Sequence, residues 1–520
     1  MSVPSDRMTD VLLHDLVTAS AAVRATRSRK AKTAALAAAL AEAAPDEVAT
    51  ATSYLSGVLR QRRTGLGWRG LTSLPEPAAE STLTVSEVHD AFEEMASLTG
   101  SGSQARRTEL VEALFGRATA DEQAYLRGLV AGELRQGALD GLMLEAVALA
   151  AAVPAAAVRR ASMFAGSTLP VAAAALTGGV DALAEFRLEP GRPVRPMLAS
   201  AADTVEEAMA KASPGGDEVA VDSKLDGIRI QVHKREGRVR VYTRSLDEIT
   251  DRVPEVVEAV ETVPAHTLVL DGEAIALTPE GRARPFQETG ARTASRVDVA
   301  TLRAQVPLTS YFFDLLHVDG VDLVDAPGHD RFARLSQVLP PALVVPRTVT
   351  RDPAQARALF DEVVAAGHEG VVVKSLDAPY DAGRRGAAWV KVKPRHTLDL
   401  VVLAVEWGSG RRQGWLSNIH LGARDPETGG FMMLGKTFKG MTDEMLAWQT
   451  ERFLALEESR TSYVVTVRPE QVVEIAFDGI QTSSRYPAGM ALRFARVLRY
   501  RDDKTADEAD TVEMVRSLRA

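Results

Sequence analysis

A lysine lies in a short polar segment, DSKLDGIR at residues 222–229, beside stretches that alternate apolar and polar residues. Lys224 follows a predicted strand, and Gly227 comes shortly after it. A tight turn at this glycine would hold the amine as an exposed nucleophile. Taken alone, such a segment is far more often a surface lysine in a polar turn, because motifs this short recur by chance. The other clusters in the chain must decide between the two.

Five further polar clusters follow in a fixed order on predicted strands. They are LDGE at 270–273, YFFD at 311–314, EGVVVK at 369–374, WVKVK at 389–393 and RFARVLRYRDDK at 493–504. Together and in this order, the six clusters resemble the motifs of the covalent nucleotidyltransferases, and specifically those of the ATP-dependent DNA ligases. The resemblance covers residues 198–505 most clearly and the N-terminal region more weakly.

The resemblance implies that Lys224 attacks the α-phosphate of ATP, releases pyrophosphate and carries AMP as a phosphoramidate. A free lysine is almost wholly protonated at neutral pH, so this lysine needs activation. Lys391 and Lys393 alternate along one strand and share a face. Cations near Lys224 favour its neutral form and stabilise phosphate oxygens. Without the resemblance, VKVK is also typical of the solvated face of a strand.

Two glutamates are the expected acidic elements. By resemblance, Glu273 contacts the nucleotide ribose and shares in metal binding, while Glu369 is the better candidate for a metal ligand. Reactions of a triphosphate require Mg²⁺, which takes a few carboxylates and completes its shell with water and phosphate oxygens. The expected cofactors are therefore ATP and Mg²⁺.

Aromatic, acidic and guanidinium groups complete the expected ATP site. Phe313 resembles the family's aromatic residue that stacks on adenine, although a lone strand phenylalanine is more often part of a core. Asp222 matches an acidic residue that accepts a hydrogen bond from the adenine amino group, where many relatives carry the longer Glu. Guanidinium forks suit contacts to sugar and phosphate oxygens. The candidates are Arg229, Arg244 and Arg385, with Arg384 as a competing assignment for the last.

The C-terminal cluster is basic in an acidic chain. Residues 484–505 hold six basic and two acidic residues, whereas the whole chain has a net charge of −9. Such a run is usually a solvated surface. By resemblance it closes over bound ATP and orients the leaving pyrophosphate. Ala495 stands where relatives commonly have proline. The expected closure and pyrophosphate residues are Arg493, Arg496, Asp503 and Lys504.

Weaker signals lie in the N-terminal region. The segment SGSQARR at 101–107 places a Gly/Ser loop before a basic helix start, which suits a phosphate contact through backbone N–H groups. GELRQG at 132–137 resembles part of the helical DNA-binding domain that precedes the catalytic core in larger ATP-dependent ligases. Scattered surface arginines are the alternative interpretation. The expected DNA contacts are Arg106, Arg107 and Arg135.

Several elements must position these residues. At about 150 residues per domain, 520 residues predict three domains. The first 190 residues are rich in Ala, Leu, Glu and Arg with apolar positions three and four apart, which predicts helices. A Pro-rich stretch at 188–198 predicts a semi-rigid linker. IRIQVHK and RVRVYTR predict a β-hairpin within a mixed α+β region. About five short strands and one helix after residue 398 suit a small β-barrel.

We therefore predict a multidomain protein with an all-α DNA-binding domain at 1–190, an α+β adenylation (nucleotidyltransferase) domain at 191–397 and an OB-fold β-barrel at 398–520. The expected activity is ATP-dependent sealing of nicks in duplex DNA through a lysine–AMP and a 5′-adenylated DNA intermediate, in repair, replication or recombination. The expected partner is nicked duplex DNA, which a monomer would encircle.

Composition excludes several other classes. The chain has no cysteine, which removes disulfides, thiolate zinc sites and iron–sulfur clusters, and disfavours the NAD-dependent ligases with their cysteine zinc site. No secretory signal or membrane-spanning stretch is visible, so we expect a cytoplasmic, nucleoid-associated protein without a membrane partner. The remaining alternatives are an RNA ligase, an mRNA capping guanylyltransferase and a non-catalytic DNA clamp. An intact Lys224 with its supporting set argues against the clamp.

Overall fold

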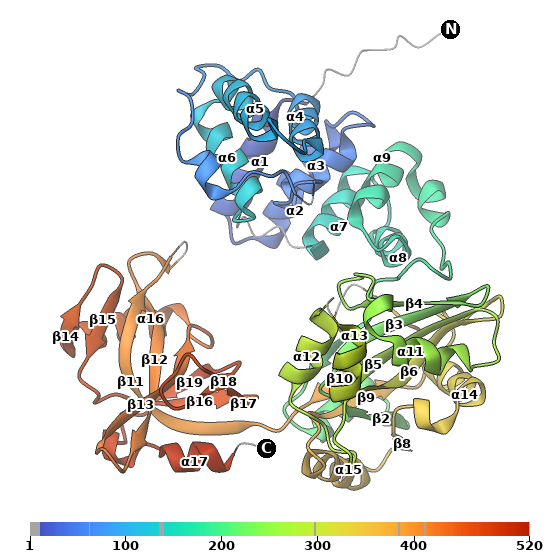
Figure 1. The fold of residues 1–520 in the computed structure, drawn as a ribbon, viewed down its shortest axis with the longest axis vertical. Helices are drawn as coiled ribbons and strands as arrows, with labels where there is room; N and C mark the ends of the chain where they lie inside the picture. The colour runs from blue at the N-terminus through green and yellow to red at the C-terminus, as the bar shows by residue number, and fades with distance from the viewer. Residues whose placement is uncertain are drawn as a thin grey trace.

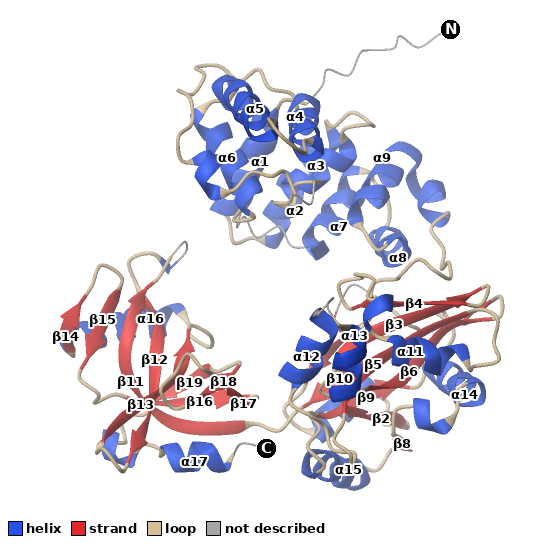
Figure 2. Cartoon of the chain, in the orientation of Figure 1, coloured by secondary structure: helices blue, strands red, loops and turns tan. Residues whose placement is uncertain are grey.

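The computed structural model describes residues 11–61, 63–134, 140–295, 298–382, 385–409 and 412–518. Figures 1 and 2 show a helical N-terminal lobe, a central lobe of strands and helices, and a C-terminal lobe built mainly of strands. The predicted order of all-α, α+β and β-rich domains is therefore confirmed. Among the described residues, no helix is long and apolar enough to cross a bilayer.

The N-terminal domain is a set of packed helices, several with side-chain caps. The Thr84 hydroxyl accepts a hydrogen bond from the Glu87 backbone, and the Glu87 carboxylate accepts one from the Thr84 backbone; Thr119 and Glu122 repeat this arrangement. The helices are α1 (Leu13–Ala25), α2 (Arg29–Ala41), α3 (Val48–Leu55), α4 (Val85–Ser97), α5 (Ser103–Arg117), α6 (Ala120–Ala131), α7 (Asp140–Ala150), α8 (Ala155–Ala165) and α9 (Thr168–Ala184), with a 3-10 turn at Trp68–Leu71.

The central domain contains two five-stranded sheets. The first has the order β4-β3-β5-β6-β7 and the second β1-β10-β9-β2-β8. The strands are β1 (Leu198–Ala201), β2 (Val219–Lys224), β3 (Ile228–Arg235), β4 (Arg238–Thr243), β5 (Leu268–Ala276), β6 (Leu308–Val318), β7 (Val321–Asp322), β8 (Arg347–Thr350), β9 (Gly370–Ser375) and β10 (Arg385–Val392). The helices are α10 (Val205–Ala212), α11 (Pro254–Glu261), α12 (Phe286–Ala294), α13 (Val299–Gln305), α14 (Gly328–Val338) and α15 (Pro353–Ala365).

The Pro-rich linker is bound to the central domain. The side-chain amide of Gln231 on β3 accepts from the Val194 backbone N–H at 2.7 Å and donates to the Val194 carbonyl at 3.1 Å. Two residues earlier on the same strand, Arg229 donates to the Met197 carbonyl at 2.6 Å. We call residues 188–197 the linker strap, because side chains of β3 hold its backbone in place.

The C-terminal domain is a strand-rich half-barrel (Figure 2). Only three residues separate the end of β10 from the start of its β11 (His396–Trp407). About five strands were predicted, and the structure describes more, because four-residue edge strands carry too little periodicity to detect. The other elements are β12 (Leu416–Asp425), β13 (Gly430–Thr437), α16 (Asp443–Ala455), β14 (Glu457–Arg460), β15 (Val464–Val467), β16 (Val472–Phe477), β17 (Gly479–Thr482), β18 (Met490–Arg493), β19 (Arg496–Tyr500) and α17 (Val512–Ser517).

Candidate active site

A cavity of about 940 Å³ lies where the two sheets of the central domain meet the C-terminal domain. All six sequence clusters contribute to it or to the elements that form its walls. The predicted residues that line it are Asp222, Lys224, Arg229, Arg244, Glu273, Phe313, Glu369, Lys391, Lys393 and Arg493. Most of the site residues predicted from the sequence therefore lie in one cavity.

Lys224 is the last residue of β2, and the turn after it is tight. A side chain at Gly227 would collide with the Ala274 carbonyl and the Glu273 side chain, so only glycine fits where the chain crosses from β2 to β3. The Lys224 side chain is 23% exposed. This geometry delivers the amine into the cavity from a rigid strand end.

A chain of opposite charges runs from Lys224 into the C-terminal domain. The Lys224 ammonium binds Oε2 of Glu369. Oε1 of the same carboxylate lies 3.0 Å from Nζ of Lys393, which also lies 3.2 Å from Oδ2 of Asp478. Glu369 thus stands between the two ammonium groups, whereas the sequence predicted direct influence of one cation on the other.

The two glutamates of the site are held in opposite protonation states. Burial acts to raise the pKa of Glu369, but the Lys224 and Lys393 ammonium groups outweigh it and hold the pKa at about 2. Glu273 has no such close partner, and burial raises its pKa to about 8 against the attraction of Lys224 and Arg229. An ionised and a protonated carboxyl therefore line the same cavity near neutral pH.

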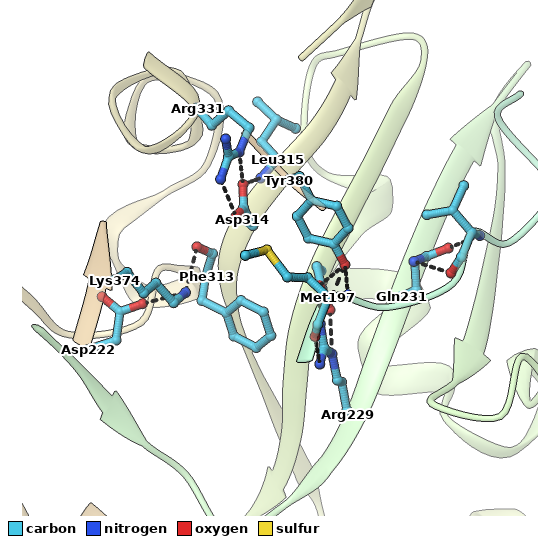
Figure 3. Close-up of polar contacts among 12 residues, drawn as sticks. Met197, Asp222, Arg229, Gln231, Phe313, Asp314, Leu315, Arg331, Lys374 and Tyr380 are labelled. Carbon is cyan, nitrogen blue, oxygen red and sulfur yellow. Dashed lines mark hydrogen bonds and ion pairs between the residues drawn. The ribbon is translucent and has the colours of Figure 1, made fainter. Parts of the chain in front are cut away.

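An aromatic corner forms the inner part of the cavity. The rings of Phe313 and Trp389 meet edge to face, with centroids 5.8 Å apart. The Lys374 ammonium lies 4.4 Å from the Phe313 ring and 4.2 Å from the Trp389 ring. Figure 3 shows Phe313 and Lys374 together beside Asp222. A flat apolar surface next to polar groups suits a stacked nucleobase.

Asp222 is neutralised by two cations that the sequence analysis did not select for this site. The Arg347 guanidinium binds both oxygens of Asp222, at 2.6 and 2.7 Å, and Lys374 lies 2.8 Å from Oδ2. Although burial opposes them, these cations lower the pKa of Asp222. Arg347 also donates to the Phe313 carbonyl at 2.8 Å. Nothing in its segment, VVPRTVT, distinguishes this arginine from an exposed strand residue.

Arg229 is likewise fixed before any ligand binds. Its guanidinium binds both oxygens of Asp271, at 2.9 and 2.6 Å, and Tyr380 donates to Asp271 at 2.7 Å. The Tyr380 hydroxyl also accepts from the backbone N–H of Met197 in the linker strap, at 2.9 Å (Figure 3). Tyr380 carried no signal in the sequence, because its partners are distant along the chain.

The predicted C-terminal closure residues separate into two groups. Arg493 reaches the cavity and lies 3.0 Å from the Asp226 carboxylate. Arg496 is exposed on β19 and does not line the cavity. Lys504 instead lies 2.6 Å from Asp399, and Asp503 lies 2.7 Å from Arg501. In this arrangement those three residues belong to the surface of the half-barrel.

The predicted phosphate contacts also differ in their placement. Arg244 is exposed on the rim of the cavity, and Lys391 lines its wall. Arg385 begins β10, but its side chain lies outside the described structure, as does Arg384.

In the N-terminal domain, Arg106 is engaged with acidic neighbours, 2.7 Å from Glu94 and 3.1 Å from Glu109. Arg107 donates to the carbonyls of Met95 and Leu98, so it supplies hydrogen-bond donors to carbonyl groups at the C-terminal end of α4. This capping role differs from the predicted DNA contact. Arg135 lies outside the described residues.

Carboxylate oxygens are the available metal donors. The described residues contain no group of three or more His, Cys, Asp or Glu side chains arranged to hold a metal. Glu273, Glu369 and Asp226 nevertheless line one cavity. A hard cation that takes one or two carboxylates and completes its shell with phosphate oxygens fits such a donor set.

Family comparisons agree with this geometry. Residues 196–393 match the ATP dependent DNA ligase domain, residues 412–504 match the ATP dependent DNA ligase C terminal region, and residues 71–148 match the DNA ligase N terminus. The solved structure Pmar-Lig_PreS3 is similar with a TM-score of 0.61 at 18% identity and covers 94% of this chain and 99% of its own. That likeness supports the fold.

Relatives of known name extend the likeness to the whole chain. A "Probable DNA ligase" of Nocardioides sp. is 64% identical over 512 residues, which cover 98% of this chain and 99% of the relative. A "Probable DNA ligase" of Beutenbergia cavernae is 63% identical over 515 residues, with 98% and 99% coverage. With Lys224, its acidic partners and an aromatic corner gathered in one cavity, the chain belongs to the ATP-dependent DNA ligase family.

Proposed function

We propose that this ligase seals nicks in duplex DNA and that Lys224 is the residue that carries AMP. The observation that supports this most strongly is the position of Lys224. It ends a strand inside a cavity that is lined by acidic, basic and aromatic residues from both sheets of the central domain and from the C-terminal domain. A lysine so placed can attack a phosphorus atom bound in the same cavity.

The proposed reaction has three steps, and in each one a bond to phosphorus forms as another breaks. The Lys224 nitrogen, after losing a proton, forms a bond to the α-phosphorus of ATP, and the bond to the pyrophosphate oxygen breaks. An oxygen of the 5′-phosphate at the nick then attacks the same phosphorus, and the P–N bond breaks to free Lys224. Finally, the 3′-hydroxyl loses its proton and attacks the 5′-phosphate, which expels AMP and closes the strand.

The other residues predicted for the nucleotide site each have a proposed contact. Phe313 stacks on adenine, beside the Asp222 and Lys374 pair that faces the edge of the base. Arg229 and Glu273 contact the ribose, while Arg244 and Arg385 contact phosphate oxygens. Lys391 and Lys393 stabilise charge on the α-phosphate. The fixed Arg229–Asp271 pair supports this, because a guanidinium held in advance loses little freedom on binding.

Mg²⁺ is the proposed cofactor beside ATP. Glu369, together with Glu273 once that carboxyl has lost its proton, would hold the ion with phosphate oxygens, and the ion would neutralise phosphate charge. Glu369 is ionised near neutral pH, as a metal ligand must be. Its carboxylate already binds two ammonium groups, so the surroundings of this carboxylate favour positive charge. The protein's own part is to keep that carboxylate oriented between Lys224 and Lys393.

The closure residues are proposed to act after a rotation of the C-terminal domain. Residues 393–395 form the short connection between β10 and β11 and allow the half-barrel to move as a unit. Arg496, Asp503 and Lys504 would then approach the pyrophosphate. We further propose that the ligase works as a monomer whose domains surround the duplex and contact mainly its backbone, Arg106 among the contacts.

A substrate comparison tests this function. The protein is incubated with Mg²⁺ and either ATP or GTP, on nicked DNA duplex and on nicked RNA duplex. We expect sealing with ATP on the DNA nick, and far less product in the other three combinations. Preferred use of GTP, or preferred sealing of RNA, would instead support a capping enzyme or an RNA ligase and would contradict the proposal.

A further inference from the structure

We propose that a second cavity, between the linker strap and the β3–β4 hairpin, binds the phosphodiester backbone of duplex DNA about six nucleotides from the nick. This inference rests on the proposed function and adds a contact that the nucleotide site does not supply. The cavity has a volume of about 380 Å³. It is lined by Glu189, Pro190, Gly191, Arg192, His233, Arg235, Glu236, Arg238 and Arg240.

Hydrogen bonds to the strap hold this cavity open. The backbone N–H of Gly191 donates to Nδ1 of His233 at 2.9 Å, and the Tyr242 hydroxyl donates to the Gly191 carbonyl at 2.8 Å. Nε2 of His233 lies 2.8 Å from the side-chain oxygen of Gln231. Both polar atoms of Gly191 are therefore fixed by β3 and β4, and the strap forms one wall of the site.

Strand register brings the basic residues to one face. His233 on β3 pairs with Arg240 on β4, and Arg235 pairs with Arg238. Because residues two apart share a face of a strand, all four side chains project to the same side. The three arginines of this face are exposed, while His233 is buried. The hairpin therefore presents a row of guanidinium groups beside the strap.

The charge of the cavity is positive after its acidic residues are counted. Glu189 lies 3.0 Å from Arg192, and Glu236 lies 3.3 Å from Arg235. Two of the four arginines are thus paired with carboxylates, and Glu248, which lies outside the lining, attracts Arg240; the lining residues themselves keep an excess of positive charge. Burial lowers the pKa of His233 to about 3, so the histidine stays neutral and serves as an acceptor for the strap. The excess charge suits a polyanion.

The place of the cavity points to duplex DNA as the occupant. β4 is the edge strand of its sheet, and Figure 1 shows it on the side of the central domain nearest α8 and α9. At the end of α8, a side chain at Gly166 would lie 3.1 Å from Leu246 and 3.2 Å from the Pro193 carbonyl, so these elements are in contact. A duplex held between the N-terminal and central domains would pass this edge.

The distance from the nucleotide site sets the position on the DNA. Arg229 and Arg235 stand at opposite ends of β3, and six residues of strand span about 20 Å. Since a DNA strand advances about 3.4 Å per nucleotide, the cavity lies roughly six nucleotides away. The proposed contact is therefore with one flanking arm of the duplex and is independent of base sequence.

The test combines two arginine variants with duplexes of different arm length. Binding of nicked duplex DNA is measured against salt for the unmodified full-length protein and for the double variant Arg238→Ala/Arg240→Ala. The double variant Arg334→Ala/Arg357→Ala removes the same charge from exposed positions on α14 and α15 and serves as the control. Each protein is measured with two long arms and with either arm cut below about six base pairs.

We expect the Arg238/Arg240 variant to bind the long-armed nick about tenfold or more weakly and to show a salt slope shallower by about 2. This difference should vanish when one particular arm is shortened. Loss equal to that of the Arg334/Arg357 control, or loss that persists whichever arm is shortened, would overturn the inference while leaving the proposed function intact. Failure of the unmodified protein to bind nicked duplex at all would overturn the proposed function itself.

Discussion

The Arg493 guanidinium donates a hydrogen bond to the Asp226 carboxylate over 3.0 Å, and this contact joins the C-terminal domain to the turn that follows Lys224. Burial, together with repulsion from Glu369, raises the pKa of Asp226, and the arginine opposes that rise. The half-barrel therefore meets the central domain directly at the nucleophile. We infer that Arg493 serves the first step, in which a positive charge must stabilise the leaving pyrophosphate.

The first prediction concerns Arg493. Arg493→Ala should lower the rate of self-adenylation by roughly 10²-fold, the loss typical of one positioned charge donor. Sealing of a nick that already carries 5′-AMP should fall much less, because no pyrophosphate leaves in that reaction. Arg499→Ala, which removes an arginine paired with Glu474 on the same domain, is the control. Equal losses in the two assays would assign Arg493 to DNA binding or folding.

A second prediction follows from the raised pKa of Glu273, about 8. Between its ordinary value of 4.5 and about 8, the folded protein keeps a proton that the unfolded chain has released. The stability contributed by this carboxyl is therefore complete below the unfolded pKa and is lost as pH rises toward 8. Glu273→Gln resembles the protonated form at every pH.

From about pH 5 to about pH 8, the free energy of unfolding of Glu273→Gln should rise relative to that of the unmodified protein by more than about 1 kcal/mol. Urea denaturation at several pH values measures this difference. Glu362→Gln removes a charge from an exposed position in the same domain and should show no such trend. A constant difference for Glu273→Gln, or one of opposite sign, would contradict the raised pKa.

A third prediction concerns Arg347, which neutralises Asp222 and holds the Phe313 carbonyl. Arg347→Ala leaves a buried carboxylate with only Lys374 as partner, so the free energy of unfolding should fall by roughly 3 kcal/mol. The KM for ATP in self-adenylation should rise, because Phe313, which we propose stacks on adenine, loses its support. Arg351→Ala, at an exposed position just after β8, should change neither quantity. An unaltered KM in a destabilised Arg347 variant would limit this residue to a structural role.

Much of the site was predictable, because its chemistry lies in short contiguous motifs. Lys224 ends β2, Glu369 directly precedes β9 and Glu273 lies within β5; each stands in a short motif, and all three line one cavity. Arg347 and Tyr380 could not be predicted, because they lie 125 and 109 residues from their partners Asp222 and Asp271. Arg347 meets Asp222 because β8 pairs with β2, and Tyr380 reaches Asp271 from the loop between β9 and β10.

The larger elements of the fold were predictable, whereas its short strands and long-range contacts were not. The β3–β4 hairpin and the helices of the N-terminal domain follow from periodicity and are confirmed. Composition predicted a semi-rigid linker at residues 188–198, but it could not show that Gln231 binds the strap. The short strands β14, β17 and β18 have four residues each, too few for a periodic signal.

The central claim is that Lys224 becomes covalently adenylated. The full-length protein is incubated with α-labelled ATP and Mg²⁺, denatured and separated on a gel, with Lys211→Ala on α10 as the control for loss of a lysine. We predict label on the unmodified protein and on the control, stable to base and released by acid as a phosphoramidate is, and none on Lys224→Ala. Label that persists on folded Lys224→Ala, or that is absent from the unmodified protein, would contradict the account.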